Sequence, residues 1–236
     1  MEIPLPAETF VLPARGWQID HRHALLAGTA CWIGFAIMAA LVASGATAGF
    51  DAAGLRMFRA GADLGLGGHA TWLEAVRDIT ALGGPFLRTV MSIAAIAALI
   101  FLRLRREAVL LAATILSGLL VETAIKIFAG RPRPQIVPHL VEAGGMSFPS
   151  GHSFNSALGL IAVALAFATY SARRRVRWTI IGSAMILSAL VAWSRVVLGV
   201  HYPSDVIAGW LGGAGWAFLA AALLYRPAKA AADATR

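Results

Sequence analysis

The sequence predicts an all-α membrane protein, a polytopic bundle of about six transmembrane helices with an amphipathic helix at the membrane interface. Hydrophobic residues make up 58% of the 236 residues and charged residues only 14%. The mean hydropathy is +0.72, which is far more apolar than an ordinary soluble domain. The apolar residues also gather in six runs of roughly 20 residues, the length that crosses a bilayer.

The first apolar run begins at Ala24, after a polar segment, 1–23, that we predict to be cytoplasmic. A signal peptide would also have a basic flank and a small-residue exit, but its apolar core is usually ~7–15 residues long. We therefore expect an uncleaved span. The domain 24–225 is followed by a predicted cytoplasmic tail, 226–236, and its expected spans are 24–45, 85–102, 108–129, 152–170, 178–198 and 205–225.

Residues 49–84 separate the first two spans and mix glycines with charged residues. Hydrophobic residues recur there at helical spacing around Leu55 and Phe58, so we predict an amphipathic segment that lies at the interface. The second span then opens at Pro85. The third span ends at Gly130-Arg131-Pro132, because proline cannot continue the helical hydrogen-bond ladder.

The charge distribution indicates topology rather than nucleic-acid binding. The net charge is +8, but the arginines fall in short clusters between apolar runs, as in a membrane protein. Cys31 is the single cysteine and lies inside an apolar run, so neither a disulfide nor a cysteine metal site is expected. Membrane lipids are the predicted surroundings, and the sequence leaves the oligomeric state open.

Orientation follows from the excess of Lys and Arg in cytoplasmic loops. With a cytoplasmic N-terminus, the basic clusters at 103–106, at 173–177 and in the tail all face the cytoplasm. Three polar stretches, 126–134, 149–152 and 194–205, then meet on the other face, where we predict one phosphate-binding and phosphoryl-transferring site. The Ala-, Gly- and Arg-rich composition suggests a bacterial inner membrane protein with this site on the periplasmic side.

The first stretch carries Lys126, Arg131 and Arg133. A lone lysine near a helix end would simply snorkel to the interface, but the two arginines follow within seven residues, each succeeded by a proline. Together with Arg195 they form a group of cations for which the sequence shows no matching carboxylates nearby. We therefore expect an uncompensated pocket that binds an anion, since the arginine fork matches phosphate oxygens.

The second stretch places Ser150, Gly151 and His152 at the start of a helix. Helix N-termini bind anions through their free N–H groups and the helix dipole. The alternative interpretation is a plain serine N-cap. His152 adds a titratable group that would donate a proton to a leaving oxygen.

The third stretch closes one span with Ser194-Arg195 and opens the next with His201 and Asp205. A carboxylate bonded to one imidazole nitrogen would fix the tautomer and leave the other nitrogen free to attack phosphorus. Equally, Asp205 would favour a helix N-terminus and His201 would be a polar interfacial residue. The pair alone does not decide between these interpretations.

Two histidines and one carboxylate also suggest a metal triad. The surrounding cations would repel a divalent ion, and they already supply the charge stabilisation that a metal would provide. The prediction is therefore a site without metal or other cofactor.

Taken together, the three stretches resemble the type 2 phosphatidic acid phosphatase (PAP2) family, whose superfamily includes the vanadium haloperoxidases. The family pattern has three parts: a lysine, six residues and Arg-Pro; then Pro-Ser-Gly-His; then Ser-Arg, five residues, His, three residues and Asp. The pattern is complete and in order, and it is met by Lys126, Arg133 and Pro134, by Pro149, Ser150, Gly151 and His152, and by Ser194, Arg195, His201 and Asp205.

The resemblance covers roughly residues 85–225 and implies a role for each matching residue. His201 would form a phosphohistidine, Asp205 would orient it, and His152 would protonate the leaving group. Spacing selects Arg133 over Arg131, which is left as a possible second phosphate or headgroup contact. The implied phosphate-binding residues are Lys126, Arg133, Ser150, Gly151, Ser194 and Arg195.

The expected function is metal-independent hydrolysis of an anionic lipid phosphate or pyrophosphate. Undecaprenyl pyrophosphate is the first candidate, and phosphatidylglycerol phosphate, phosphatidate and lipid A phosphates compete with it, because the motifs recognise the phosphate and not the lipid tail. One alternative is a vanadate-dependent haloperoxidase-like enzyme, although those relatives are soluble and much longer. Another is a non-catalytic anionic-lipid transporter. This alternative is disfavoured because the chain retains His152, His201 and Asp205.

Overall fold

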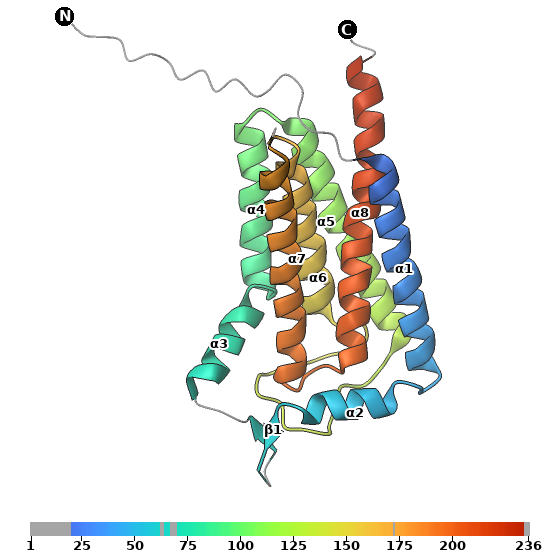
Figure 1. Cartoon of the computed structure of the whole chain (residues 1–236), viewed down its shortest axis with the longest axis vertical. Helices are drawn as coiled ribbons and strands as arrows, with labels where there is room; N and C mark the ends of the chain where they lie inside the picture. Colours follow the sequence, from blue (N-terminus) through green and yellow to red (C-terminus); the bar gives the residue numbers. More distant parts are fainter. Residues whose placement is uncertain (1–19, 62–63, 67–69, 172, 234–236) are drawn as a thin grey trace, which may run out of the picture.

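A computed structural model describes residues 20–61, 64–66, 70–171 and 173–233 of the chain. Six long helices form the bundle in Figure 1, in which the earliest helix packs along the last one. The predicted N-terminal segment lies almost wholly outside the described residues. The long helices are α1 (His21–Ala43), α4 (Pro85–Phe101), α5 (Arg105–Ala129), α6 (Gly151–Ala168), α7 (Arg174–Val197) and α8 (Pro203–Asp233).

The bundle agrees with the prediction of about six membrane spans. Among the described residues, five helices are long and apolar enough to cross a membrane by themselves. A sixth span results when the segments Thr71–Ala81 and Pro85–Phe101, bent by 46° at their junction, are taken as one. A mainly helical, membrane-spanning fold is therefore confirmed.

The predicted amphipathic segment is more irregular than one interfacial helix. It consists of α2 (Ala48–Arg56), which lies across the lower end of the bundle in Figure 1, and α3 (Ala70–Ala81). Between them, β1 (Arg59–Ala60) pairs antiparallel with β2 (Gly65–Leu66). This short hairpin is an addition to the all-α prediction.

Helix ends follow local sequence signals at the site end of the bundle. Pro85 stands at the first position of α4, where its missing N–H costs nothing. Helix α5 ends at Ala129 because Gly130 adopts a left-handed conformation, with φ of 58°. Helix α8, by contrast, continues to Asp233 through much of the predicted tail.

Helices α6 and α8 touch at the level of their backbones. A Cβ atom added at Gly213 of α8 would lie 2.0 Å from the carbonyl oxygen of Phe154 in α6, and one at Gly209 would lie 2.7 Å from that of Ser150. No side chain fits at either position, so glycine is required for this approach. The contact holds the start of α6 beside the second and third turns of α8.

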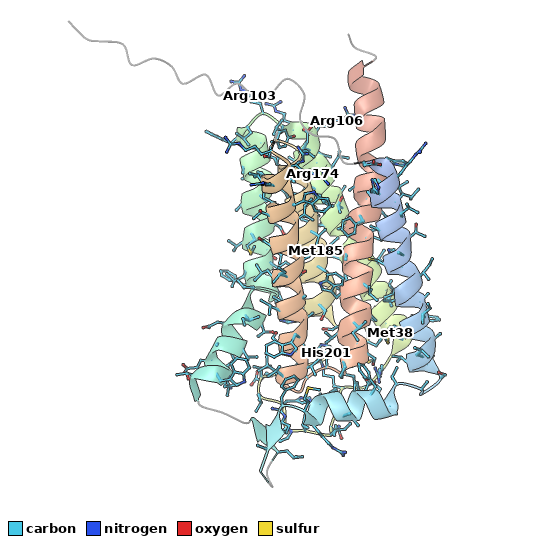
Figure 2. The ribbon with its side chains drawn as sticks, viewed as in Figure 1. Met38, Arg103, Arg106, Arg174, Met185 and His201 are labelled. Carbon is cyan, nitrogen blue, oxygen red and sulfur yellow. The ribbon has the colours of Figure 1, made fainter. Side chains whose placement is uncertain are left out.

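The two ends of the bundle differ in chemistry. Figure 2 shows Arg103, Arg106 and Arg174 at one end and His201 at the other. The segment from α5 to α6, the turn from α7 to α8 and the interfacial elements meet at the end that carries His201. The fold thus brings the three polar stretches of the sequence to one end.

Candidate active site

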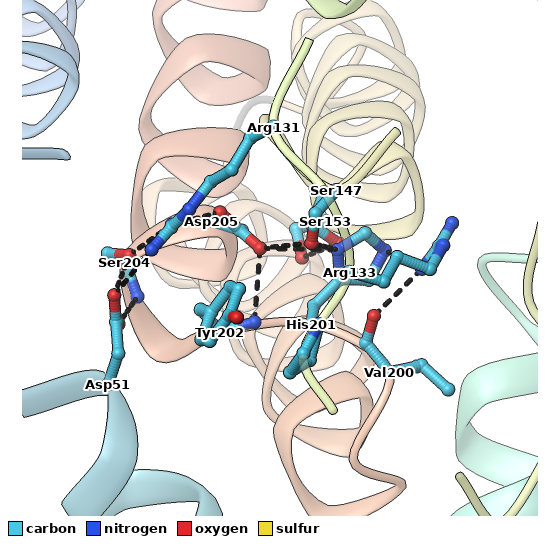
Figure 3. A network of polar contacts seen from close by, with 12 residues as sticks. Asp51, Arg131, Arg133, Ser147, Ser153, Val200, His201, Tyr202, Ser204 and Asp205 are labelled. Atoms are coloured by element: carbon cyan, nitrogen blue, oxygen red, sulfur yellow. Dashed lines mark hydrogen bonds and ion pairs between the residues drawn. The ribbon is translucent and has the colours of Figure 1, made fainter. Parts of the chain in front are cut away.

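His201 lies in the short turn between α7 and α8, and only 1% of its surface is exposed. Its Nδ1 atom is 3.3 Å from Ser147 Oγ and 3.6 Å from Asp205 Oδ2. Its Nε2 atom is 3.1 Å from Nη1 of Arg133 (Figure 3). Because a guanidinium only donates hydrogen bonds, Nε2 accepts and the proton resides on Nδ1. The lone pair of Nε2 therefore faces the cations.

Burial lowers the pKa of His201 from 6.5 to about 4. Asp205 opposes this shift through its hydrogen bond and its charge, whereas the charges of Arg133 and Arg195 add to it. His201 is consequently neutral at neutral pH, which is the protonation state that a nitrogen nucleophile needs.

Asp205 has no exposed surface and accepts hydrogen bonds at both carboxylate oxygens. Arg131 Nη1 donates to Oδ1 over 2.5 Å, and Ser147 Oγ donates to Oδ2 over 2.5 Å. The backbone N–H of Tyr202 also donates to Oδ2, over 3.0 Å. These contacts fix the carboxylate beside His201, and its role in the reaction stays a prediction.

Arg131 is held by carboxylates rather than left open to a ligand. Besides Asp205, its guanidinium donates to Asp51 Oδ2 over 2.8 Å and to Ser204 Oγ over 2.8 Å, and it stacks 4.1 Å above the ring of Tyr202. Burial by itself would lower the pKa of Arg131, but the nearby carboxylates outweigh burial and raise it. The suggested second phosphate contact thus belongs to the carboxylate side of the site.

Asp51 on α2 anchors this network from below (Figure 3). Only 1% of it is exposed, and it accepts hydrogen bonds from the backbone N–H of Ser204 over 2.9 Å and from Ser204 Oγ over 2.8 Å. The interfacial helix is thereby tied to the first turn of α8, which carries Asp205.

Lys126 and Arg195 make fewer contacts. Lys126 Nζ lies 3.1 Å from Glu122 Oε1, one helical turn earlier, and Arg195 donates from Nη1 to Thr80 Oγ1 over 2.9 Å. The Nε atom of Arg195 is buried with no hydrogen-bond partner. The expectation of cations without nearby carboxylates was wrong, because Glu122 and Asp51 come from outside the loop in which acids were sought.

Arg133 lies over His201 and is supported by the chain around it. Its guanidinium donates to the carbonyl oxygens of Gly144 and Gly145, and Nη1 donates to Val200 O over 2.8 Å. Burial lowers the pKa of Arg133, and the charge of Asp205 partly opposes the shift. Arg133 thus lies next to His201 Nε2, whereas Arg131 pairs with carboxylates; phosphate binding by Arg133 stays a prediction.

Ser150, Gly151 and His152 form the first turn of α6 beside Lys126. A Cβ atom on Gly151 would lie 3.4 Å from Lys126 Nζ, so the lysine reaches this helix start. Ser150 makes no side-chain cap; its hydroxyl accepts from Ser153 Oγ over 2.9 Å, and its N–H donates to Asp205 O over 3.0 Å. The plain N-cap interpretation is therefore not what the structure shows.

Ser194 is the predicted site residue that is turned away from this group. Its hydroxyl donates to Val191 O in its own helix over 2.6 Å, so its hydrogen is already used. Among the described residues, no group of three His, Cys, Asp or Glu side chains is placed to share a metal ion. Independence of metal stays a prediction.

Sequence reasoning missed Asp51, Thr80, Glu122 and Ser147. Glu122 carried a signal, because it stands four residues before Lys126 and so on the same helix face. Asp51 is an isolated acid in a segment rich in alanine and glycine, where a buried carboxylate would require a partner. Thr80 and Ser147 have no pattern that distinguishes them from ordinary polar residues.

The fold and the complete motif set define a membrane phosphatase of the PAP2 class. The model of the PAP2 superfamily matches residues 106–229, more than half of the chain, and the chain belongs to this superfamily. The family match and the membrane-spanning fold show that the protein is an integral membrane lipid phosphatase.

Phosphatidylglycerophosphatase B of Bacillus subtilis is 31% identical over 143 residues, which are 58% of this chain and 68% of that protein. An undecaprenyl-diphosphatase of Sulfolobus acidocaldarius is 41% identical over 73 residues, 31% of each chain. The crystal structure of a transmembrane PAP2 type phosphatidylglycerolphosphate phosphatase from Bacillus subtilis superposes with a TM-score of 0.73 at 27% identity, covering 82% of this chain and 93% of that one. The named substrates of these relatives differ.

Proposed function

We propose that this lipid phosphatase acts through a phosphohistidine on His201, at the periplasmic face of a bacterial inner membrane. The observation that carries the proposal is the position of the His201 ring, whose Nε2 lies beside Arg133 while Nδ1 faces Ser147 and Asp205. The arginine-rich opposite end of the bundle supports a cytoplasmic location for that end.

In the proposed reaction, Nε2 of His201 attacks phosphorus as the bond from phosphorus to the leaving oxygen breaks. The leaving oxygen keeps the bonding electron pair and takes a proton from His152. Water then attacks the phosphohistidine and gives a proton back to His152, which releases inorganic phosphate and restores His201. Lys126, Arg133 and Arg195 stabilise the charge on the phosphoryl oxygens, so the chemistry requires no metal.

Undecaprenyl diphosphate is the favoured substrate, and phosphatidylglycerol phosphate, phosphatidate and lipid A phosphates are its competitors. An extracytoplasmic site suits dephosphorylation of a carrier lipid. The names of the relatives support both a diphosphatase and a phosphatidylglycerolphosphate phosphatase. Assays on all four lipid classes therefore identify the preferred substrate.

The test is phosphate release from these lipids by purified protein in detergent. We expect His201→Ala to abolish release, and substrate-derived radiolabel to be trapped on wild-type protein quenched in alkaline detergent but not on this variant. His23→Ala is the matched control, since His23 is exposed at the other end of the bundle and pairs with Asp20. Release that persists in His201→Ala, or that EDTA abolishes and Mg²⁺ restores, would contradict the proposal.

A further inference from the structure

A groove between α4 and α6 runs from the active-site end of the bundle along the apolar surface. Its exposed surface is mostly apolar. Its polar residues are Arg88, Asn155 and two serines, Ser92 and Ser156, whose hydroxyls already donate to carbonyl oxygens of their own helices. Its other lining residues include Leu82, Met91, Leu160 and Val163. An apolar groove with two polar groups at one end fits an amphiphilic ligand better than water or lipid tails alone.

Asn155 is buried, and its side-chain oxygen is unpaired among the described residues. Only 5% of the residue is exposed, and its Oδ1 atom has no partner among the described residues. A buried amide in this state costs free energy unless a ligand satisfies it. Asn155 stands one turn after His152 on α6, so the unsatisfied amide lies near the proposed proton donor.

Arg88 is a second polar side chain that borders the groove, and it is half-buried. Its guanidinium makes no hydrogen bond or ion pair with a described residue, although its charge interacts with Glu122 and with His152. The cations Lys126, Arg131, Arg133 and Arg195 all have side-chain or backbone partners. The guanidinium of Arg88, by contrast, is open to an anion outside the His201 pocket.

The position of His152 relates this pair to the reaction. A Cβ atom on Gly83, in the turn before α4, would lie 3.5 Å from the His152 ring, and the neighbouring Leu82 borders the groove. The leaving group of the reaction starts at the oxygen that His152 protonates. It therefore leaves the site where Arg88 and Asn155 stand.

We propose that Arg88 and Asn155 bind the leaving phosphate of a lipid diphosphate, and that the first part of its hydrocarbon chain lies in the groove. This inference rests on the proposed function. When His201 attacks the terminal phosphorus, the bond to the bridging oxygen breaks, and the lipid monophosphate departs with the electron pair and the proton from His152. A partly protonated phosphate offers both an anion to Arg88 and an O–H donor to Asn155 Oδ1. A lipid monoester offers no anion to Arg88, because its leaving group is a neutral alcohol.

The test compares farnesyl diphosphate with farnesyl monophosphate, which share one chain, by kcat/KM for phosphate release in detergent. Arg88→Gln should lower kcat/KM about tenfold or more on the diphosphate, the effect of one charge-assisted hydrogen bond, and less than about threefold on the monophosphate. Arg88→Lys should lower kcat/KM on the diphosphate less than Arg88→Gln does. Asn155→Ala should cause a smaller loss, which is again larger on the diphosphate than on the monophosphate. Arg105→Gln, exposed at the opposite end, should change neither value.

An equal loss on both substrates in Arg88→Gln would overturn the inference, because it would mean that Arg88 acts through His152 or through the fold. No change on either substrate would overturn it as well. Thermal melting of each variant separates a misfolded protein from a specific loss, and Arg88→Lys gives the comparison if Arg88→Gln does not fold. If the wild-type protein releases phosphate from neither lipid, the proposed function itself fails, and this assignment fails with it.

Discussion

The two halves of the site are built differently. The carboxylate half, composed of Asp51, Arg131, Ser147, Ser204 and Asp205, is a closed network in which each side chain has a partner (Figure 3). The cation half, composed of Arg88, Lys126, Asn155 and Arg195, keeps buried atoms without hydrogen bonds, among them Arg195 Nε and Asn155 Oδ1. The difference fits the proposed reaction, in which His201 would be oriented in advance and the bound phosphate would supply the missing hydrogen-bond partners of the cation half.

Replacing Asp205 is the strongest way to break the carboxylate half. Asp205→Asn keeps the shape but removes the charge that holds the proton on Nδ1 of His201, so kcat should fall about 10⁴-fold, as for aspartates that orient a catalytic histidine in other enzymes. Phosphate release in single-turnover experiments measures this. Glu142→Gln, an exposed carboxylate in the α5–α6 loop, should leave the rate unchanged, and a similar loss there would refute the assignment.

Replacing Asp51 should lower the stability of the folded protein more than it changes the reaction itself. Asp51→Ala leaves Arg131 with one buried carboxylate and Ser204 with unmet donors, and should cost about 3–5 kcal/mol of stability. Because the residues share one network, the double variant Asp51→Ala/Arg131→Ala should lose less than the sum of the single losses. Thermal melting in detergent measures these effects. Asp78→Ala, exposed on α3, is the control, expected within about 0.5 kcal/mol of wild type.

The cation half should be stabilised by bound phosphate. Inorganic phosphate should raise the melting temperature of the wild-type protein, with a stabilisation of about 2.7 kcal/mol at one hundred times its dissociation constant. Arg195→Gln should remove most of this effect and change the melting temperature without phosphate much less. Arg174→Gln, at the far end of the bundle (Figure 2), should keep the full response. If the stabilisation by phosphate were lost in Asp51→Ala but kept in Arg195→Gln, the carboxylate half and not the cation half would be the phosphate-binding half.

Most of the bundle was predictable, because the bilayer fixes the length and polarity of each span and proline and glycine mark its ends. Gly130 and Pro85 stand where helices end and begin. The hairpin after α2 was not predictable, since its two-residue strands are shorter than any periodic pattern can reveal.

For the site, motif spacing pointed to Arg133 and Asp205, which the structure places beside His201, but not to Ser147, which also contacts it. Asp51, Thr80 and Arg88 are different, since each reaches the site from a separate segment of the interfacial region or of α4. Only the folded chain shows that these segments come together. The same reason explains why Arg131 looked like a ligand for phosphate: its carboxylate partner Asp51 is 80 residues away in sequence.

The backbone contact between α6 and α8 has a consequence for how the enzyme can diversify. Gly209 and Gly213 set the gap between the helix that begins near His152 and the helix that begins before Asp205. We expect the distance between these helices to be fixed. Gly213→Ala should therefore inactivate the protein, whereas Gly182→Ala, at a position that faces open space, should be tolerated. Activity and thermal melting of the two variants test this. Adaptation to bulkier lipids would then fall to α4, which borders the groove and has no glycine within its own length.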